Sequence, residues 1–186
     1  MKNKFVLVIG RASTGSKLIA KLMAHILGVT EYGTWEGHDC PIENNSENIV
    51  IHKSLPNDRD WPDVNGIISE YPDHEIYIII TTREETLAKQ SRTDTYHWTE
   101  EQEENDKFLS KNIISSVMNS GNKFFIWSYE TFMFLGIDYL ISLCKFMGIE
   151  EPEIPDYDFI DANPKRIRDS IVSAFRKWMN NYLMIE

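Results

Sequence analysis

The chain has 186 residues, of which 42% are hydrophobic and 26% are charged. This is enough apolar sequence for one substantial core and leaves little room for a second, so residues 1–186 are predicted to form a single domain. With 19 Lys and Arg against 29 Asp and Glu, the formal net charge of -10 disfavours nonspecific binding to nucleic acid or to an anionic membrane surface.

The two cysteines, Cys40 and Cys144, are far apart and form no C-x-x-C spacing, which argues against a disulfide framework or a structural zinc site. The N-terminal residues lead straight into an apolar strand without the features of a signal peptide, and no run of about 18 apolar residues occurs. We therefore expect a cytoplasmic protein without membrane contact. No sequence pattern indicates the oligomeric state.

The first element along the chain is an apolar strand, Phe5–Ile9, which is followed by Gly10. The apolar spacing becomes that of a helix from Leu18 to Leu27, so a short polar turn joins the two elements. The first turn of a helix exposes unpaired N–H groups and the positive end of the helix dipole. The residues from Thr14 to Lys17 are therefore predicted to bind an anion.

The rest of the chain continues this alternation of strands and helices. Residues 30–48 are rich in turn formers and predict a loop, and the β-branched run Ile49–Ile51 predicts a second strand with His52 at its carboxyl end. Later elements are predicted as a helix over about 61–71, a strand over 76–82, a helix from Arg83, helices over 99–119, 135–147 and 165–184, and a strand over 123–127. The acidic run from Glu100 to Asp106 is predicted to be a solvated helix start. Six aromatic residues are predicted to lie in the core: Phe124, Phe125, Trp127, Phe132, Phe134 and Phe146.

The order of these elements predicts an α/β fold of three layers, α/β/α, in which helices cover both faces of a central, mainly parallel sheet. Ligands of such sheets bind at the carboxyl ends of the strands. The segments 10–17, 52–56, 82–95 and 127–131 follow predicted strands, so we expect them to converge on one site.

The sequence of the turn after the first strand is similar to that of a nucleotide-binding loop but differs from it at two positions. The P-loop of kinases has the pattern G-x-x-x-x-G-K-[ST], whereas this chain has Gly10, four residues, Gly15 and then Ser16-Lys17, with the last two positions exchanged. A P-loop kinase of the nucleoside-monophosphate type is one interpretation. Against it, Thr81-Thr82 stand at the end of the 76–82 strand, where an Mg²⁺-binding Asp is expected.

Four motifs, taken together, resemble those of the sulfotransferase family and cover most of the chain. Ser13 to Ile19 is similar to the family's 5′-phosphosulfate loop, [RK]-S-G-[ST]-[ST]-L-[LI]. Arg83 and, eight residues later, Ser91 resemble the pair that binds the 3′-phosphate in the family's R-D-P-R-D-x-x-x-S. Ile51 to Pro56 is similar to K-[ST]-H-x-P, and Ser128 to Glu130 looks like the start of Y-E-[DE]-L.

The resemblance implies a P-loop fold with sulfotransferase-like topology, which binds 3′-phosphoadenosine 5′-phosphosulfate and needs no metal. It implies transfer of the sulfuryl group to a hydroxyl or amine of a small-molecule or glycan acceptor. The residues that it assigns to the donor are Arg11, Ser13, Thr14, Gly15, Ser16, Lys17, Leu18, Arg83 and Ser91. His52 is the candidate general base, and Lys17 or Lys53 is the candidate to stabilise the leaving phosphate oxygen.

The chain departs from the family pattern at two catalytic positions. Ser13 stands where the family usually has a Lys or Arg that assists the leaving oxygen, a role for which Arg11, two residues earlier, is a further candidate. Ser54 stands where the catalytic His usually lies, but His52 shares its face of the strand. A third interpretation is therefore a shortened, non-catalytic member that binds the nucleotide as a module.

Overall fold

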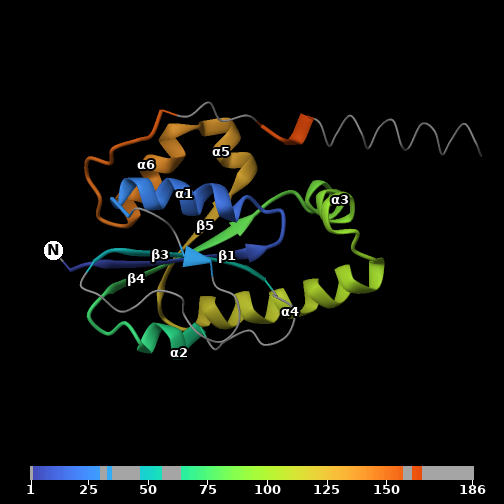
Figure 1. Cartoon of the computed structure of the whole chain (residues 1–186), viewed down its shortest axis with the longest axis horizontal. Coiled ribbons are helices and arrows are strands. Elements are labelled where there is room, and N and C mark those ends of the chain that lie inside the picture. Colours follow the sequence, from blue (N-terminus) through green and yellow to red (C-terminus); the bar gives the residue numbers. More distant parts are fainter. Residues whose placement is uncertain (1, 30–32, 35–46, 56–63, 157–160, 165–186) are drawn as a thin grey trace, which may run out of the picture.

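Strands and helices alternate along the chain in the computed structural model, which describes residues 2–29, 33–34, 47–55, 64–156 and 161–164 (Figure 1). The strands are β1 (Lys4–Arg11), β2 (Gly33–Thr34), β3 (Ile49–Leu55), β4 (Glu75–Thr82) and β5 (Lys123–Ser128). The helices are α1 (Ser16–Ile26), α2 (Val64–Ser69), α3 (Glu85–Tyr96), α4 (Glu100–Asn119), α5 (Tyr129–Leu135) and α6 (Ile137–Phe146).

The strands form one sheet in the order β2-β3-β1-β4-β5, and each neighbouring pair is parallel. β1 lies at the centre, between β3 and β4, and its residues from Lys4 to Gly10 are all buried. A strand that is covered on both faces is apolar throughout, which explains the unbroken run Phe5–Ile9. The predicted α/β fold with a parallel sheet is confirmed.

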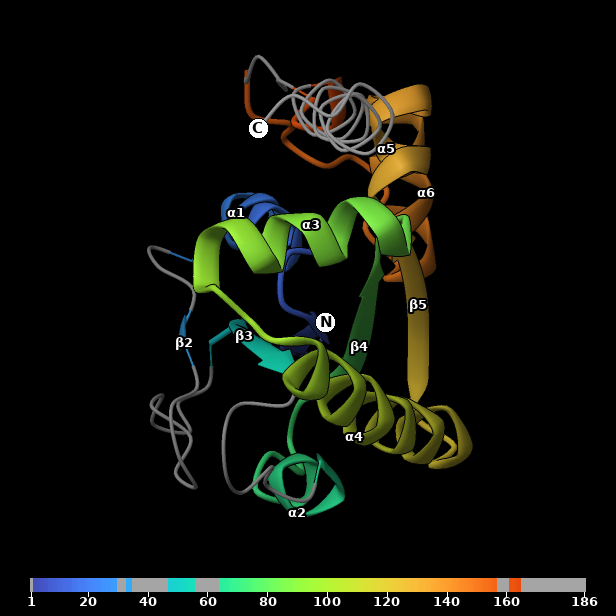
Figure 2. The same ribbon diagram turned by 90° about the vertical axis from the view of Figure 1, so that its right-hand side faces the viewer.

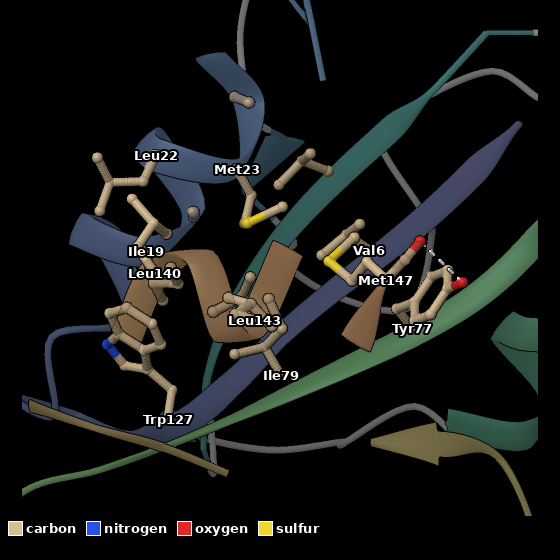
Figure 3. Packing of buried hydrophobic residues seen from close by; sticks show 14 of the residues in the cluster. Val6, Ile19, Leu22, Met23, Tyr77, Ile79, Trp127, Leu140, Leu143 and Met147 are labelled. Atoms are coloured by element: carbon tan, nitrogen blue, oxygen red, sulfur yellow. Dashed lines mark hydrogen bonds between the residues drawn. The ribbon is translucent and has the colours of Figure 1, made fainter. Parts of the chain in front are cut away.

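Helices cover both faces of the sheet and make three layers, with α1, α5 and α6 on one side and α2 and α4 on the other (Figure 1). Alternate residues of β1 point to the two faces. Val6 therefore packs in the core cluster beneath α1 and α6, whereas Leu7 packs in the cluster above α2 and α4. Figure 3 shows the first cluster, where Leu143 of α6 lies next to Ile79 of the sheet and Met23 of α1 points toward Leu143.

The helix that was expected from Arg83 begins two residues later, at Glu85. The carboxylate of Glu84 accepts hydrogen bonds from the N–H groups of Thr86 and Leu87 and so caps α3. Arg83 consequently lies in the turn after β4 and not on the helix. This leaves its side chain at the carboxyl edge of the sheet.

Other boundaries also differ from the predictions. The helix predicted over 135–147 is confirmed as α6, whereas α5, which precedes it and ends before Gly136 with a φ of 57° that favours glycine, was not predicted. The loop predicted over 30–48 contains β2, which pairs with β3, and β3 itself continues to Leu55. The helix over 99–119 is confirmed as α4, with a capping box between Thr99 and Gln102. Residues 61–63 of the predicted 61–71 helix, and the predicted final helix over 165–184, lie outside the described residues.

Two predictions about burial hold for most of their residues but are wrong for three of them. Within the acidic run at the start of α4, Glu103 and Asp106 are buried, because Glu103 pairs with the buried Arg92 and both pair with the partly buried Arg11. Phe134 is 87% exposed, because it lies on the opposite side of α5 from Phe132, which is buried two residues earlier. Among the described residues, no helix is long and apolar enough to span a bilayer.

Candidate functional site

The carboxyl ends of β1 and β4 lie side by side, and the helices α1 and α4 in the connections from these two strands cover opposite faces of the sheet. β1 continues into α1 on one face, whereas β4 leads through α3 into α4 on the other, as Figure 1 and Figure 2 show. Neighbouring strands whose connections diverge in this way leave a crevice between their ends, and ligands of parallel α/β sheets bind there. The candidate site is therefore the loop after β1 together with the turn after β4.

The loop between β1 and α1 is compact and closely approached by β4. Thr14 donates from its backbone N–H and from its hydroxyl to the carbonyl of Arg11, at 3.3 and 2.7 Å. Its Oγ1 also lies 2.7 Å from Oγ1 of Thr81, in a hydrogen bond that joins the loop to β4. Gly10 is needed at the end of β1, because a Cβ at this position would collide with the Thr81 side chain.

The start of α1 keeps backbone donors for a ligand. Gly15 caps the helix with a φ of 84°, and its carbonyl accepts the N–H groups of Leu18 and Ile19 at 3.0 and 3.3 Å. In the described part of the chain, no group accepts from the backbone N–H of Ser16 or Lys17. These donors and the positive end of the α1 dipole are together able to bind an anion.

Arg83 lies beside this loop and is held by neutral groups. Its Nη1 donates to the carbonyl of Ser13 at 3.1 Å, and its Nε and Nη2 donate to Oδ1 of Asn163 at 3.0 and 2.6 Å. The guanidinium carbon is 4.7 Å from the ring centroid of Tyr129, a cation–π contact. The same ring occupies the space that a Cβ on Gly15 would need. Among the described residues, no carboxylate forms an ion pair with Arg83.

His52 lies in the middle of β3 and not at its carboxyl end, because β3 continues to Leu55, but its side chain reaches the start of α1. It is only 2% exposed, and its Nε2 is 2.8 Å from Oγ of Ser16. Burial, together with the positive charges of Lys17 and Lys53, lowers the pKa of His52 to about 4. The imidazole is therefore neutral at physiological pH and shares a hydrogen bond with a loop hydroxyl.

The two candidate lysines differ in burial. Lys17 is exposed in the first turn of α1, whereas Lys53 is 3% exposed. Because successive residues of a strand point to opposite faces, Lys53 lies on the face of β3 that carries Ile51, and His52 lies on the α1 side. Only Lys17 therefore shares the first turn of α1 with the backbone donors of the loop.

Leu18 and Ser91 complete the residues that the motifs assigned to the donor. Leu18 packs against the core cluster beneath α1. Ser91 is buried on α3, and no described hydrogen bond joins it to Arg83. Leu18 therefore packs within the fold, and Ser91 is buried without a described contact to the loop.

Arg11 lies among carboxylates. Its Nε bonds to Oδ2 of Asp106 at 2.6 Å, its Nη2 to Oε2 of Glu103 at 2.9 Å, and its Nη1 to Oε1 of Glu85. Burial alone would lower the pKa of Arg11, but the hydrogen bond and the charge of Asp106 raise it above its usual value. The charge of Arg11 is thus matched within the fold.

Arg92 of α3 is fully buried and joins the same group, which we call the arginine–carboxylate cluster (Arg11, Glu85, Arg92, Glu103 and Asp106). Its Nε and Nη2 bond to the two carboxylate oxygens of Glu103 at 2.6 and 3.0 Å. Its Nη1 donates to the carbonyl of Ala12 at 3.0 Å, inside the loop. The cluster therefore fastens the first half of the loop to α3 and α4.

The expected convergence of segments is confirmed by three contacts: Arg83 reaches Ser13, His52 reaches Ser16, and Tyr129 covers Gly15. Sequence reasoning missed the roles of Asn163 and of the carboxylates in the cluster. Glu85 and Arg92, seven residues apart on one helix, carried a usable signal, because this spacing places them on the same face. Asn163 carried none, since no pattern links it to Arg83.

Neither a protein-family model nor a curated protein matches this chain. Within the described ranges, no group of His, Cys, Asp and Glu side chains is arranged to hold a metal ion. The function proposed for the chain therefore depends on the chemistry of the residues around the loop.

Proposed function

We propose that the chain binds 3′-phosphoadenosine 5′-phosphosulfate at the loop between β1 and α1 and transfers the sulfuryl group to a hydroxyl or amine of a small-molecule or glycan acceptor. The observation that carries this proposal is the position of Arg83, a partly buried cation with neutral partners beside an anion-binding loop. A buried charge is costly unless an opposite charge pairs with it. A bound phosphate would supply that charge.

The residues around the loop fit a nucleotide with phosphates at two places. The backbone N–H groups of Ser16 and Lys17 would hold the 5′-phosphate at the start of α1. Arg83 would hold the 3′-phosphate with charge-assisted hydrogen bonds, which are stronger than those between neutral groups. Gly15 lets the loop lie directly against Tyr129, whose ring also lies against Arg83.

When bound, the donor supplies an activated sulfuryl group, and its transfer asks the protein mainly to position groups and to neutralise charge. Lys17, exposed in the first turn of α1, would stabilise the leaving phosphate oxygen. His52 is neutral and so is able to accept the acceptor's proton. A bound polyanion would offset the charge of Lys17 and raise the pKa of His52 toward the range of a general base.

A non-catalytic nucleotide-binding module is the second candidate, and one observation favours it. Nε2 of the buried His52 already bonds to Ser16, so an acceptor reaches this atom only if the hydrogen bond breaks. In such a module, His52 would only hold the loop hydroxyl. The kinase alternative has less support, because Thr81, at the end of β4, bonds to Thr14 and offers no carboxylate for Mg²⁺.

The binding step is tested by thermal denaturation with 3′-phosphoadenosine 5′-phosphate and, separately, with ATP and Mg²⁺. The first ligand should raise the melting temperature and the second should not, because a ligand that binds only the folded chain stabilises it. Arg83→Ala should abolish most of the shift, whereas Lys89→Ala, which removes an exposed cation from α3, should preserve it. Stabilisation by ATP and Mg²⁺ alone would overturn the proposal.

The transfer step is tested with radiolabelled phosphosulfate donor and a library of acceptors. A sulfotransferase should label an acceptor, and His52→Ala should lose labelling while it still binds 3′-phosphoadenosine 5′-phosphate. His25→Ala, which changes an exposed histidine on α1, serves as the control. Binding without labelling of any acceptor would favour the module.

A further inference from the structure

Asn163 contacts Arg83 although 80 residues separate the two in the sequence. It lies in the short segment 161–164, close to α5 at the carboxyl edge of the sheet (Figure 1). The residue is 8% exposed, and its Oδ1 accepts from both Nε and Nη2 of Arg83. The amide oxygen of Asn163 therefore accepts from both nitrogens on one edge of the Arg83 guanidinium.

Asn163 is itself fixed by its neighbours. Its backbone N–H donates to Oδ1 of Asp161 at 2.9 Å, and the preceding N–H of Ala162 donates to the hydroxyl of Tyr129 at 2.9 Å. Its Nδ2 is 3.4 Å from Oε1 of Glu130, which can only accept. Because an amide nitrogen donates and an amide oxygen accepts, these contacts direct Oδ1 toward Arg83.

The contacts of Arg83 leave part of its donor capacity for a ligand. A guanidinium has five N–H donors. Asn163 accepts two of them and the carbonyl of Ser13 accepts a third, so one donor on Nη1 and one on Nη2 have no described partner. A carboxylate in place of Asn163 would also orient the guanidinium, but it would neutralise the charge, as the carboxylates do for Arg11.

We infer that Asn163 is a positioning residue for nucleotide recognition: it holds the guanidinium of Arg83 in a fixed direction and leaves its remaining donors and its full charge to the 3′-phosphate. This inference rests on the proposed function. Fixing a flexible side chain before binding lowers the entropy that binding must overcome. The amide oxygen of a neutral Asn does this without competing for the charge.

The test is calorimetric titration of the full chain with 3′-phosphoadenosine 5′-phosphate and with adenosine 5′-monophosphate, which lacks the 3′-phosphate. Asn163→Ala should lower the affinity for 3′-phosphoadenosine 5′-phosphate about tenfold, which is the scale of a hydrogen bond to a charged group. It should leave the affinity for adenosine 5′-monophosphate unchanged. In an Arg83→Ala background, Asn163→Ala should have no further effect, because its action passes through Arg83. Asn122→Ala, which lies before the amino end of β5, is the matched control.

A second measurement needs no nucleotide. The Nε–H signal of Arg83 in the NMR spectrum should be protected from solvent exchange in the wild type and in Asn163→Asp, and it should be lost to exchange in Asn163→Ala. Asn163→Asp should nevertheless bind 3′-phosphoadenosine 5′-phosphate more weakly than the wild type. The new carboxylate would keep the guanidinium of Arg83 oriented but would neutralise its charge. Together these results separate positioning from a structural role.

The outcomes distinguish the two claims. A wild-type chain that does not prefer 3′-phosphoadenosine 5′-phosphate over adenosine 5′-monophosphate overturns the assignment of Arg83 in the proposed function. If the wild type has this preference and Asn163→Ala keeps it in full, only the role of Asn163 is overturned. Tighter binding by Asn163→Ala also overturns that role, since Asn163 would then compete with the phosphate.

Discussion

Three arginines contact or adjoin the loop between β1 and α1, and their surroundings differ in charge. Arg11 and Arg92 lie in the arginine–carboxylate cluster, where each bonds to Glu103 and to at least one other carboxylate. Arg83 instead bonds to an amide oxygen and a carbonyl oxygen and lies against an aromatic ring. Arg92 and Arg83 bond to neighbouring carbonyls of the loop, those of Ala12 and Ser13.

The difference separates a structural role from a binding role. Cations that are matched by buried carboxylates hold the first half of the loop in place and have little charge left for a ligand. A cation with neutral partners at the same loop attracts an anion. A basic residue close to a motif in the sequence does not necessarily bind the nucleotide. Arg11 is such a residue, and its charge is neutralised by carboxylates of α4, far along the chain.

We expect the largest loss of stability from Arg92→Ala. The change leaves Glu103 buried with one partner fewer and removes the donor to Ala12, so we expect a loss of about 3–5 kcal/mol in the free energy of unfolding. Urea denaturation measures it. Arg83→Ala is the matched variant and should lose only about 1 kcal/mol, because its partners are neutral and its charge is unpaired. Equal losses would contradict the distinction between the two surroundings.

The next largest effect is a dependence of the free energy of unfolding on pH, which we expect from His52. The pKa of His52 is lowered from 6.5 to about 4 in the folded chain, so the unfolded chain binds the proton more readily. The contribution of neutral His52 to the free energy of unfolding is therefore complete above pH 6.5. It is lost as the pH falls toward 4, and the total loss is about 3 kcal/mol.

Denaturation at a series of pH values measures this loss, which should shrink in His52→Gln and persist in the exposed-residue control His25→Gln. An unchanged pH dependence in His52→Gln would contradict the assignment. Saturating 3′-phosphoadenosine 5′-phosphate should offset the charge of Lys17, which lowers the pKa of His52 in the free chain. It should therefore raise the pKa of His52, seen as a shift in its NMR titration.

The sequence was sufficient for the parts of the site that follow from periodicity and strand order. Parallel strands bring their carboxyl ends to one edge, so the meeting of Arg83 with the loop followed from two apolar runs and the residues after them. The burial of Glu103 was not predictable in this way. Glu103 is buried because it forms ion pairs with Arg11 and Arg92, which belong to other elements. The spacing of apolar residues along α4 does not indicate such ion pairs.

Gly15→Ala tests the contact that joins the loop to the surroundings of Arg83. The added Cβ would lie 2.9 Å from Cδ2 of Tyr129, and a φ of 84° costs about 1–2 kcal/mol for a residue with a Cβ. Gly28→Ala is the matched control, since Gly28 also has a positive φ, 67°, but nothing lies within 4 Å of its added Cβ.

Thermal denaturation should show a larger loss for Gly15→Ala than for Gly28→Ala, and only Gly15→Ala should weaken binding of 3′-phosphoadenosine 5′-phosphate. Similar losses in the two variants would mean that the loop and the Tyr129 ring move apart at no cost. In that case the ring would not link Arg83 to the loop.

The smallest effect is expected from Tyr129→Phe, which removes the hydroxyl that accepts from Ala162 and keeps the ring against Arg83. A lost hydrogen bond between neutral groups costs about 1 kcal/mol, measured by urea denaturation. Nucleotide affinity should stay the same, whereas Tyr129→Leu, which also removes the ring, should lower it. If Tyr129→Phe lowers the affinity as much as Tyr129→Leu, the hydroxyl and the segment that it holds, and not the ring, orient Arg83. The orientation of Arg83 would then depend on Asn163 and the carbonyl of Ser13.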